Sequence, residues 1–305
     1  MTFTITLSNN QINKIISQYE CNRNDSNVTN NYTLFRAKIK STTLTIFKTG
    51  KLLLQGNDII PVQNEIEQLL NLKPSLNIKA NTKIISIGKN IIGTDEVGTG
   101  DYFGGIVVCA SLVEKDKILE LTKLGIKDSK EITDEKIKIL GKYLIENIKH
   151  TVLLLNNKKY NQIYSKTMNL NKIKAILHNK VILNFLNKYP NTNFDKIVID
   201  SFCQTNKYFE YLENINETYK TVELIEKAEN KYISVAASSI IARYYFLKHL
   251  EDLSKATGYN LIKGASKQVD KLAYKIINEK GLDFLYNIAK INFKNTLKAK
   301  EDNNA

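Results

Sequence analysis

The chain has 305 residues, of which 43% are hydrophobic, with a formal net charge of +13 and a pI near 9.3. A hydrophobic share close to globular usage excludes a disordered chain, and the length allows two domains. The excess of positive charge predicts a polyanionic partner, and it leaves nucleic acid and an anionic membrane surface both open.

Several other classes of protein are not expected. The start, MTFTITLSNN, lacks the basic region and long apolar stretch of a signal peptide, and the longest apolar runs, such as residues 105–113, are too short to cross a bilayer. Cys21, Cys109 and Cys203 are odd in number and form no CxxC pair, so neither a disulfide framework nor a zinc ribbon is expected. The sequence predicts a soluble, cytoplasmic protein without a membrane partner.

The first 72 residues predict a small α+β domain. Strand-like alternation and short turns mark four strands, and the spacing of apolar residues marks two helices. A small sheet backed by two helices is the simplest assembly. The expected strands are 2–7, 35–39, 44–46 and 52–54, and the expected helices are 12–19 and 63–70.

Basic residues gather on one strand of this domain. Between residues 36 and 51 there are five basic residues and no acid. Arg36, Lys38 and Lys40 alternate with apolar residues and therefore share one face of the predicted strand, with Lys48 nearby. Such a face is ordinarily a solvated sheet surface, but the charge bias favours contact with a nucleic-acid backbone, without readout of base sequence.

The rest of the chain predicts a larger α/β domain over residues 85–297. A polar stretch at 73–84 is the expected linker, and residues 298–305 are expected to form a frayed tail. We expect a mixed five-stranded sheet with helices on both faces, in which the last two strands are central and parallel to the first. The expected strands are 91–96, 105–113, 151–156, 196–200 and 221–226.

Four acids occupy positions suited to a metal site. Asp95 and Glu96 end a buried strand, where unpaired charge is costly, and Asp200 ends the KIVID strand at the edge where open α/β sheets bind ligands. Glu229 lies at the start of a predicted helix. Oxygen ligands without histidine or cysteine select Mg²⁺ or Mn²⁺, and two such ions suit phosphodiester hydrolysis.

Other residues near these acids have two interpretations each. Lys127, Ser129 and Lys130 suit DNA phosphate or a solvated loop. Lys231 could neutralise the acids or orient a phosphate. Asp101 is more typical of a turn that bonds nearby backbone.

One histidine and one glycine segment complete the candidate residues. A lone helical histidine such as His178 is ordinarily a surface or packing residue, with assistance to proton transfer as the alternative. Gly98 and Gly100, without Cβ atoms, allow a backbone to approach a bulky ligand.

Long motifs in this part of the chain resemble type 3 ribonuclease H (RNase HIII). They are GTDEVGTGDYFGG from residue 93, GIKDSKEITDEKI at 125–137, MNLNKIKAILHN at 168–179, VIDSF at 198–202 and KAENKYISVAASSIIAR at 227–243, followed by KGAS with Val269 and Asp270. The segment FRAKIKSTTLTIFKTGKLLLQG is similar to the appended N-terminal domain of that family, whose fold resembles the TATA-binding protein.

The resemblance implies a ribonuclease H fold that cleaves the RNA strand of an RNA/DNA hybrid, leaving 5′-phosphate and 3′-hydroxyl ends. Asp95, Glu96, Asp200 and Glu229 fall on the family's acidic metal positions, and the glutamate at 229 favours type 3 over type 2. Gly98, Thr99 and Gly100 match a segment whose main chain contacts 2′-hydroxyls. A monomer without an obligate protein partner is expected.

Two alternatives remain. The first is a type 2-like enzyme that cuts at single ribonucleotides in DNA, and the second is a non-catalytic hybrid-binding protein whose acids are structural. The chain also departs from the family pattern at Gly105, Ser201 and Ser238, where proline, glutamine and alanine are usual.

Overall fold

The structure is a computed structural model that describes residues 2–24, 32–56, 59–71, 88–126 and 129–301. The chain divides into two compact units, residues 1–81 and 82–305. The predicted linker at 73–84 lies outside the described residues, so the predicted domain limits stay a prediction.

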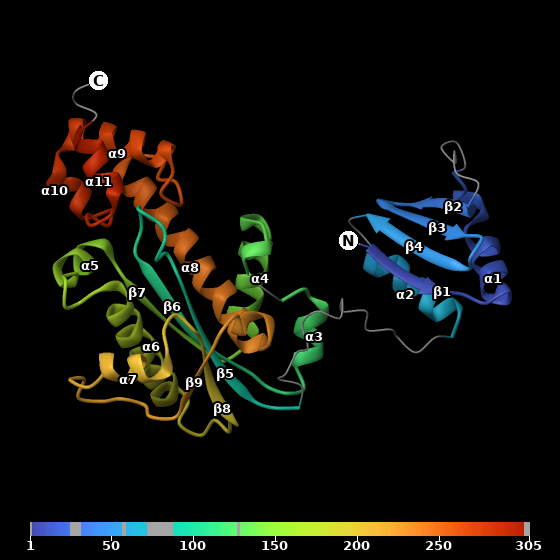
Figure 1. Cartoon of the computed structure of the whole chain (residues 1–305), viewed down its shortest axis with the longest axis horizontal. Helices are drawn as coiled ribbons and strands as arrows, with labels where there is room; N and C mark the ends of the chain where they lie inside the picture. The colour runs from blue at the N-terminus through green and yellow to red at the C-terminus, as the bar shows by residue number, and fades with distance from the viewer. Residues whose placement is uncertain (1, 25–31, 57–58, 72–87, 127–128, 302–305) are drawn as a thin grey trace. The chain divides into compact units, whose positions relative to one another are not determined.

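The N-terminal unit is an antiparallel sheet with strand order β1-β4-β3-β2. Alternate residues of its strands form one core with its two helices, so the helices cover a single face of the sheet (Figure 1). The predicted sheet with two helices is therefore present, while its similarity to the TATA-binding protein stays a prediction. The elements are β1 (Thr2–Thr6), α1 (Asn9–Tyr19), η1 (Glu20–Asn22), β2 (Thr33–Ile39), β3 (Thr42–Phe47), β4 (Lys51–Gly56) and α2 (Ile59–Leu69).

The second unit contains a mixed five-stranded sheet of order β7-β6-β5-β8-β9, which confirms the predicted fold class. β5, β8 and β9 run parallel, while β6 is antiparallel to both of its neighbours. The expectation that the last two strands are both central was wrong for β9, a four-residue edge strand with one buried residue. The strands are β5 (Ile91–Val97), β6 (Ile106–Val113), β7 (His150–Leu155), β8 (Lys196–Asp200) and β9 (Val222–Ile225).

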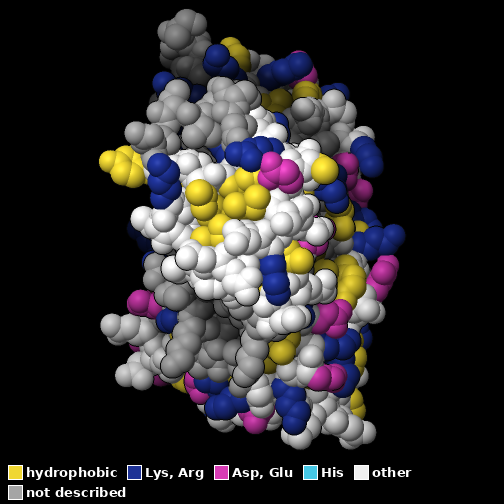
Figure 2. All heavy atoms as spheres, turned by 90° about the vertical axis from the view of Figure 1, so that its right-hand side faces the viewer, with side chains coloured by type: hydrophobic (Ala, Val, Ile, Leu, Met, Phe, Trp, Pro, Cys, Tyr) yellow, Lys and Arg dark blue, Asp and Glu magenta, His cyan; other side chains and the backbone are white. Residues whose placement is uncertain are grey.

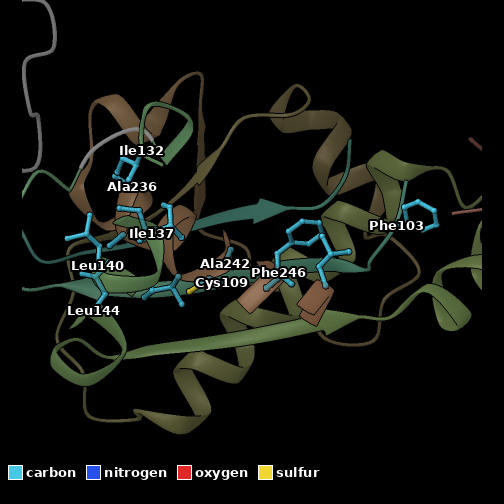
Figure 3. Packing of buried hydrophobic residues seen from close by; sticks show 14 of the residues in the cluster. Phe103, Cys109, Ile132, Ile137, Leu140, Leu144, Ala236, Ala242 and Phe246 are labelled. Atoms are coloured by element: carbon cyan, nitrogen blue, oxygen red, sulfur yellow. The ribbon is translucent and has the colours of Figure 1, made fainter. Parts of the chain in front are cut away.

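Helices cover both faces of this sheet (Figure 1). β6 is buried along its whole length because its alternate residues enter two separate cores. On one side Cys109 packs with α4 (Asp134–Asn147) and α8 (Ile233–Thr257), where Leu140, Ala236 and Phe246 lie in the same cluster (Figure 3). On the other side the core includes α6 (Leu170–Lys188) and α7 (Thr205–Tyr211).

The end of the chain forms further helices around the second unit. The predicted frayed tail was wrong in part, because α11 (Lys294–Glu301) continues through residue 301 and Ala299 is fully buried. The remaining elements of this unit are α3 (Ile118–Lys123), η2 (Ser129–Glu131), α5 (Asn157–Ile163), η3 (Ala228–Asn230), α9 (Lys267–Lys280) and α10 (Leu282–Tyr286).

The positive charge is not confined to one patch. On the face shown in Figure 2, Lys and Arg side chains are spread over the surface with Asp and Glu side chains between them. None of the described helices combines the length and apolar composition that crossing a bilayer requires. On the face in Figure 2, surface charge by itself does not mark one binding patch.

α8 packs on β5 at a glycine. A Cβ added to Gly93 would lie 2.3 Å from the backbone nitrogen of Val235, so only glycine allows this approach. The hydroxyl of Ser238 donates to the Gly93 carbonyl at 2.8 Å and lies 2.9 Å from the hydroxyl of Ser111. This pair of contacts accounts for serine at position 238, where the family usually has alanine.

Gly93→Ala should therefore lower the free energy of unfolding by about 2–4 kcal/mol, because α8 must move away from β5. Chemical denaturation measures the change. Gly100→Ala is the matched control, since a Cβ there meets nothing within 4 Å. Equal stability of the two variants would contradict the close packing of α8.

Candidate active site

The two acids at the end of β5 point to opposite faces of the sheet, as successive strand residues do. Asp95 faces α8 and accepts a hydrogen bond from Ser239. Glu96 faces α6, where Lys174 and His178 meet it. The acid pair therefore has one member on each side of the sheet's edge.

Glu96 has a basic partner at each carboxylate oxygen. Lys174 Nζ donates to Oε1 at 2.9 Å, and His178 Nε2 lies 2.9 Å from Oε2. His178 is fully buried, and its Nδ1 lies 2.8 Å from the Thr94 hydroxyl. Lys174 also lies over the ring of Phe202, 4.1 Å from its centroid.

Sequence reasoning missed Lys174 and gave His178 only a minor role. The two residues are four apart on α6, which places them on one helical face. This spacing predicts that Lys174 and His178 share a face of the helix, but it does not predict that this face meets Glu96.

The other two acids meet on the α8 side of the sheet. The parallel register Thr94↔Ile199 places Asp200 beside Asp95 at the carboxyl ends of β5 and β8. Asp200 accepts a hydrogen bond from the Ala228 amide at 2.9 Å and makes a side-chain hydrogen bond with Glu229. Glu229 lies in the short helix η3 before α8, a correction to its predicted place at the start of a helix.

Mutual repulsion and burial disturb the protonation of these acids. Burial, with the charges of Glu96 and Asp200, raises the pKa of Asp95 well above its usual range. Burial, with the charges of Glu229 and Glu96, raises the pKa of Asp200 to about 7 against the hydrogen bond from Ala228. Burial acts on Glu96 too, but His178 and Lys174 outweigh it and hold its pKa below the ordinary value.

Strong coupling of this kind is typical of functional sites. The negative charges of these neighbouring carboxylates repel one another, so a divalent cation bound among them would stabilise the site. One observation fits such an ion directly: Glu229 is 7% exposed, and its Oε2 has no hydrogen-bond partner among the described residues. A buried acceptor without a partner is costly unless something fills the position.

The acids do not form a ready-made cage. Among the described residues, no three His, Cys, Asp or Glu side chains stand close enough together to hold a metal ion. The carboxylates are instead arranged by Lys174, His178, Ser239 and the Ala228 amide.

The glycine segment after β5 divides into a buried and an exposed part. Gly98 is buried at φ 99°, and a Cβ there would lie 2.3 Å from the Gly105 carbonyl, so packing alone requires this glycine. Thr99 is half-buried, and Gly100 is exposed with open space around it. The main chain at 99–100 is therefore the part that a ligand can reach.

The loop predicted to contact DNA phosphate is only partly described. Lys127 lies outside the described residues, Lys130 is exposed on η2, and Ser129 is buried. The Ser129 hydroxyl lies 2.7 Å from that of Ser239, which in turn bonds Asp95. Ser129 is thus linked to the acid cluster, while its predicted phosphate contact stays a prediction.

Two further charged residues hold backbone groups. Lys231 donates to the Glu226 carbonyl at 2.8 Å, so its ammonium bonds backbone. Asp101 accepts a hydrogen bond from the Gly264 amide at 2.6 Å. Asp101 therefore bonds backbone, as predicted, but the prediction that this backbone is nearby in sequence was wrong, because Gly264 is 163 residues away.

The basic residues of the N-terminal unit do not all share one face. Arg36 and Lys38 lie on the side of β2 opposite the core, opposite Thr45 and Thr43 of β3. Lys40 and Lys48 lie instead in the turns at the two ends of β3. The prediction that Lys40 continues the basic face of the strand was wrong, because the strand ends at Ile39.

Two departures from the family pattern have local explanations. A Cβ at position 105 would lie 2.3 Å from the Leu155 carbonyl, so this chain needs glycine where proline is usual. The hydroxyl of Ser201 donates to the Cys203 carbonyl at 3.0 Å and helps to turn the chain after Asp200.

The region that contains the four acids matches a known protein family. The family model described as "Ribonuclease HII" matches residues 92–296, which include all four acids. The chain belongs to the ribonuclease HII family. As a member it is an enzyme of the ribonuclease H type. A second model, a domain of unknown function (DUF3378), matches residues 2–74.

Relatives within the family are similar over nearly the whole chain. A protein named ribonuclease HIII from Streptococcus gordonii is 40% identical over 300 residues, covering 98% of both chains. One with the same name from Phytoplasma mali is 41% identical over 297 residues, covering 97% of both. The crystal structure of Bst-RNase HIII in complex with Mn²⁺ matches with a TM-score of 0.69 and 33% identity, covering 100% of this chain and 99% of that one.

The raised pKa of Asp200 predicts a pH effect on stability. Because its pKa is about 7 in the folded protein and 3.8 ordinarily, the folded state binds the extra proton between these values. The stability contributed by that proton is present at low pH and is lost as the pH rises through 7. In chelator-treated buffer, Asp200→Asn should therefore gain stability over the wild type between pH 5 and pH 8.

We expect a gain on the order of 1–2 kcal/mol, discounted because the carboxyl is partly exposed. Thermal unfolding at the two pH values measures it, with Asp283→Asn on the exposed surface of α10 as the control. A stability difference for Asp200→Asn that is the same at both pH values would contradict the shift.

Proposed function

We propose that the chain hydrolyses the RNA strand of RNA/DNA hybrids, leaving 5′-phosphate and 3′-hydroxyl ends. The single observation that supports this most is the cluster of acids at the ends of β5 and β8, beside which Glu229 of η3 has a buried oxygen without a hydrogen-bond partner among the described residues. Family membership supplies the reaction class, and the acids supply a site with the charge that the reaction needs.

Asp95, Glu96, Asp200 and Glu229 would hold the divalent ions in this proposal. Two such ions, when bound, activate a water molecule and stabilise the leaving oxygen of a phosphodiester. Mg²⁺ and Mn²⁺ both suit an all-oxygen site, and the Bst-RNase HIII structure was solved in complex with Mn²⁺. The protein's own part is to fix the carboxylates and concentrate negative charge where cations are required.

Lys174 and His178 orient one of these ligands. Their bonds to both oxygens of Glu96 restrict its rotation and keep it ionised. The arrangement resembles the outer contacts that commonly orient metal-binding carboxylates.

The exposed main chain at Thr99 and Gly100 would contact the RNA strand. Thr99 and Gly100 lie three and four residues after Glu96, so an RNA backbone that lies along them would have a phosphate near the acids. The 2′-hydroxyl is the group that distinguishes RNA from DNA, and main-chain groups can bond it.

The N-terminal unit would bind the duplex through the uncovered face of its sheet. Both helices cover the other face, so Arg36 and Lys38 remain available to phosphates. Lys40 and Lys48 extend the positive charge into the turns. Binding of this kind is independent of base sequence and weakens with salt.

A type 2-like enzyme that cuts at single ribonucleotides in DNA is the second candidate. Two duplexes separate the candidates, one with a single ribonucleotide and one with an all-RNA strand. Preference for the all-RNA strand supports type 3, as does glutamate at position 229. Monomeric state and cytoplasmic location stay predictions.

Asp95→Asn and Asp200→Asn should each reduce cleavage of an all-RNA hybrid at least about a thousand-fold, because each removes a charged ligand. Hybrid affinity, measured in chelator, should change by less than about threefold. Gel-based cleavage with Mg²⁺ and with Mn²⁺ gives the rates, and Asp283→Asn is the control. Retained turnover in both variants would contradict the proposed site. Absence of metal-dependent cleavage by the wild type would favour a binding protein with structural acids.

Lys38→Glu should weaken hybrid binding and reduce the slope of log K against log salt by about 1, because a phosphate contact is lost. Fluorescence anisotropy in chelator at several salt concentrations measures the slope. Lys14→Glu makes the same charge change on the exposed side of α1. If both variants lose affinity equally, the sheet face is not the binding surface.

A further inference from the structure

A fully buried lysine lies next to the glycine segment, outside the acid cluster. Lys290 is 0% exposed, between α10 and α11. Burial lowers its pKa to about 7, a sign of how unfavourable the position is for an ammonium group. Among the described residues it makes no salt bridge. A lysine in such a place needs a specific set of acceptors.

Those acceptors are main-chain carbonyls of one loop. Lys290 Nζ donates to the carbonyls of Asp101 at 2.7 Å, Gly104 at 2.6 Å and Gly105 at 3.4 Å. The Gly104 carbonyl also accepts from Asn157 Nδ2 at 2.8 Å. An ammonium has three N–H donors, so its hydrogen-bonding capacity matches this single loop.

The same loop is joined to the C-terminal part of the chain by its backbone. The Lys290 amide donates to the Tyr102 carbonyl at 2.9 Å, and the Tyr102 amide donates to the Gly264 carbonyl at 2.9 Å. The Gly104 amide donates to the Ile288 carbonyl at 3.0 Å. These backbone bonds hold Tyr102 and Gly104, whereas the ammonium also holds Asp101 and Gly105 at the two ends of the loop.

Movement of this loop would reach the glycine segment directly. The Asp101 amide donates to the Gly98 carbonyl at 3.3 Å. Gly98 packs so closely on the Gly105 carbonyl that no Cβ fits between them. Lys290 therefore bonds Asp101 and Gly105, both of which contact Gly98.

We propose that Lys290 is a positioning residue for substrate: its ammonium fixes the carbonyls of Asp101, Gly104 and Gly105, and so holds the main chain of Gly98–Gly100 in the conformation that binds the RNA strand. The inference rests on the proposed function. The acids lie on β5, β8 and η3 and do not contact Lys290, so its loss should affect binding more than the chemical step.

The test is steady-state cleavage of an all-RNA hybrid by full-length Lys290→Met, which keeps the length of the side chain and removes its donors. We expect KM to rise about tenfold while kcat stays within about twofold, because binding that is equal in ground and transition states is lost. Lys298→Met is the matched control, since that lysine lies nearby on α11 with a side chain 55% exposed.

Asn157→Ala is the second variant, in case Lys290→Met does not fold. It removes only the side-chain donor to Gly104, and a KM rise in the same direction is expected. A lower melting temperature with unchanged KM and kcat, in whichever of the two variants folds, would overturn the positioning role. Absence of cleavage by the wild type would instead contradict the proposed function.

Discussion

Negative charge held at the carboxyl ends of β5 and β8 is the constraint on which the site depends. Asp95, Asp200 and Glu229 lie on one side of the sheet, where burial and repulsion raise the pKa values of both aspartates. Such a cluster is unfavourable for the fold by itself. Its retention makes sense if a cation binds there, and the unpartnered oxygen of Glu229 is consistent with that.

Hydrogen bonds from both sides of the sheet limit the cost of burying these acids. Lys174 and His178 bond Glu96, and α6 is fixed for this purpose by its own core. Ser239 of α8 bonds Asp95, and the approach of α8 depends on Gly93 and Ser238. The helices that cover the two faces of the sheet therefore also supply polar groups to the acids, two from α6 and one from α8.

A second set of contacts holds the glycine segment that is proposed to bind the substrate. The loop after the glycine segment is bonded by Lys290 and Asn157 and is attached to the C-terminal helices. The acids are bonded by side chains of α6 and α8, whereas Lys290, near the end of the chain, bonds the loop after the glycine segment. Because Lys290 bonds the loop and not the acids, its substitution should affect binding more than chemistry.

The sequence by itself determined the family, the mixed sheet and the places of Asp95, Glu96 and Asp200 at strand ends, because strand patterns and motifs are local. Only the tertiary structure decided that Lys174 bonds an acid 78 residues away and that Lys290 bonds a loop 189 residues away. It also placed β9 at the edge and showed that residues 298–301 of the predicted tail belong to a helix. Periodicity tells which residues are buried, but partners across a fold depend on how helices are rotated and packed, and no local pattern records that.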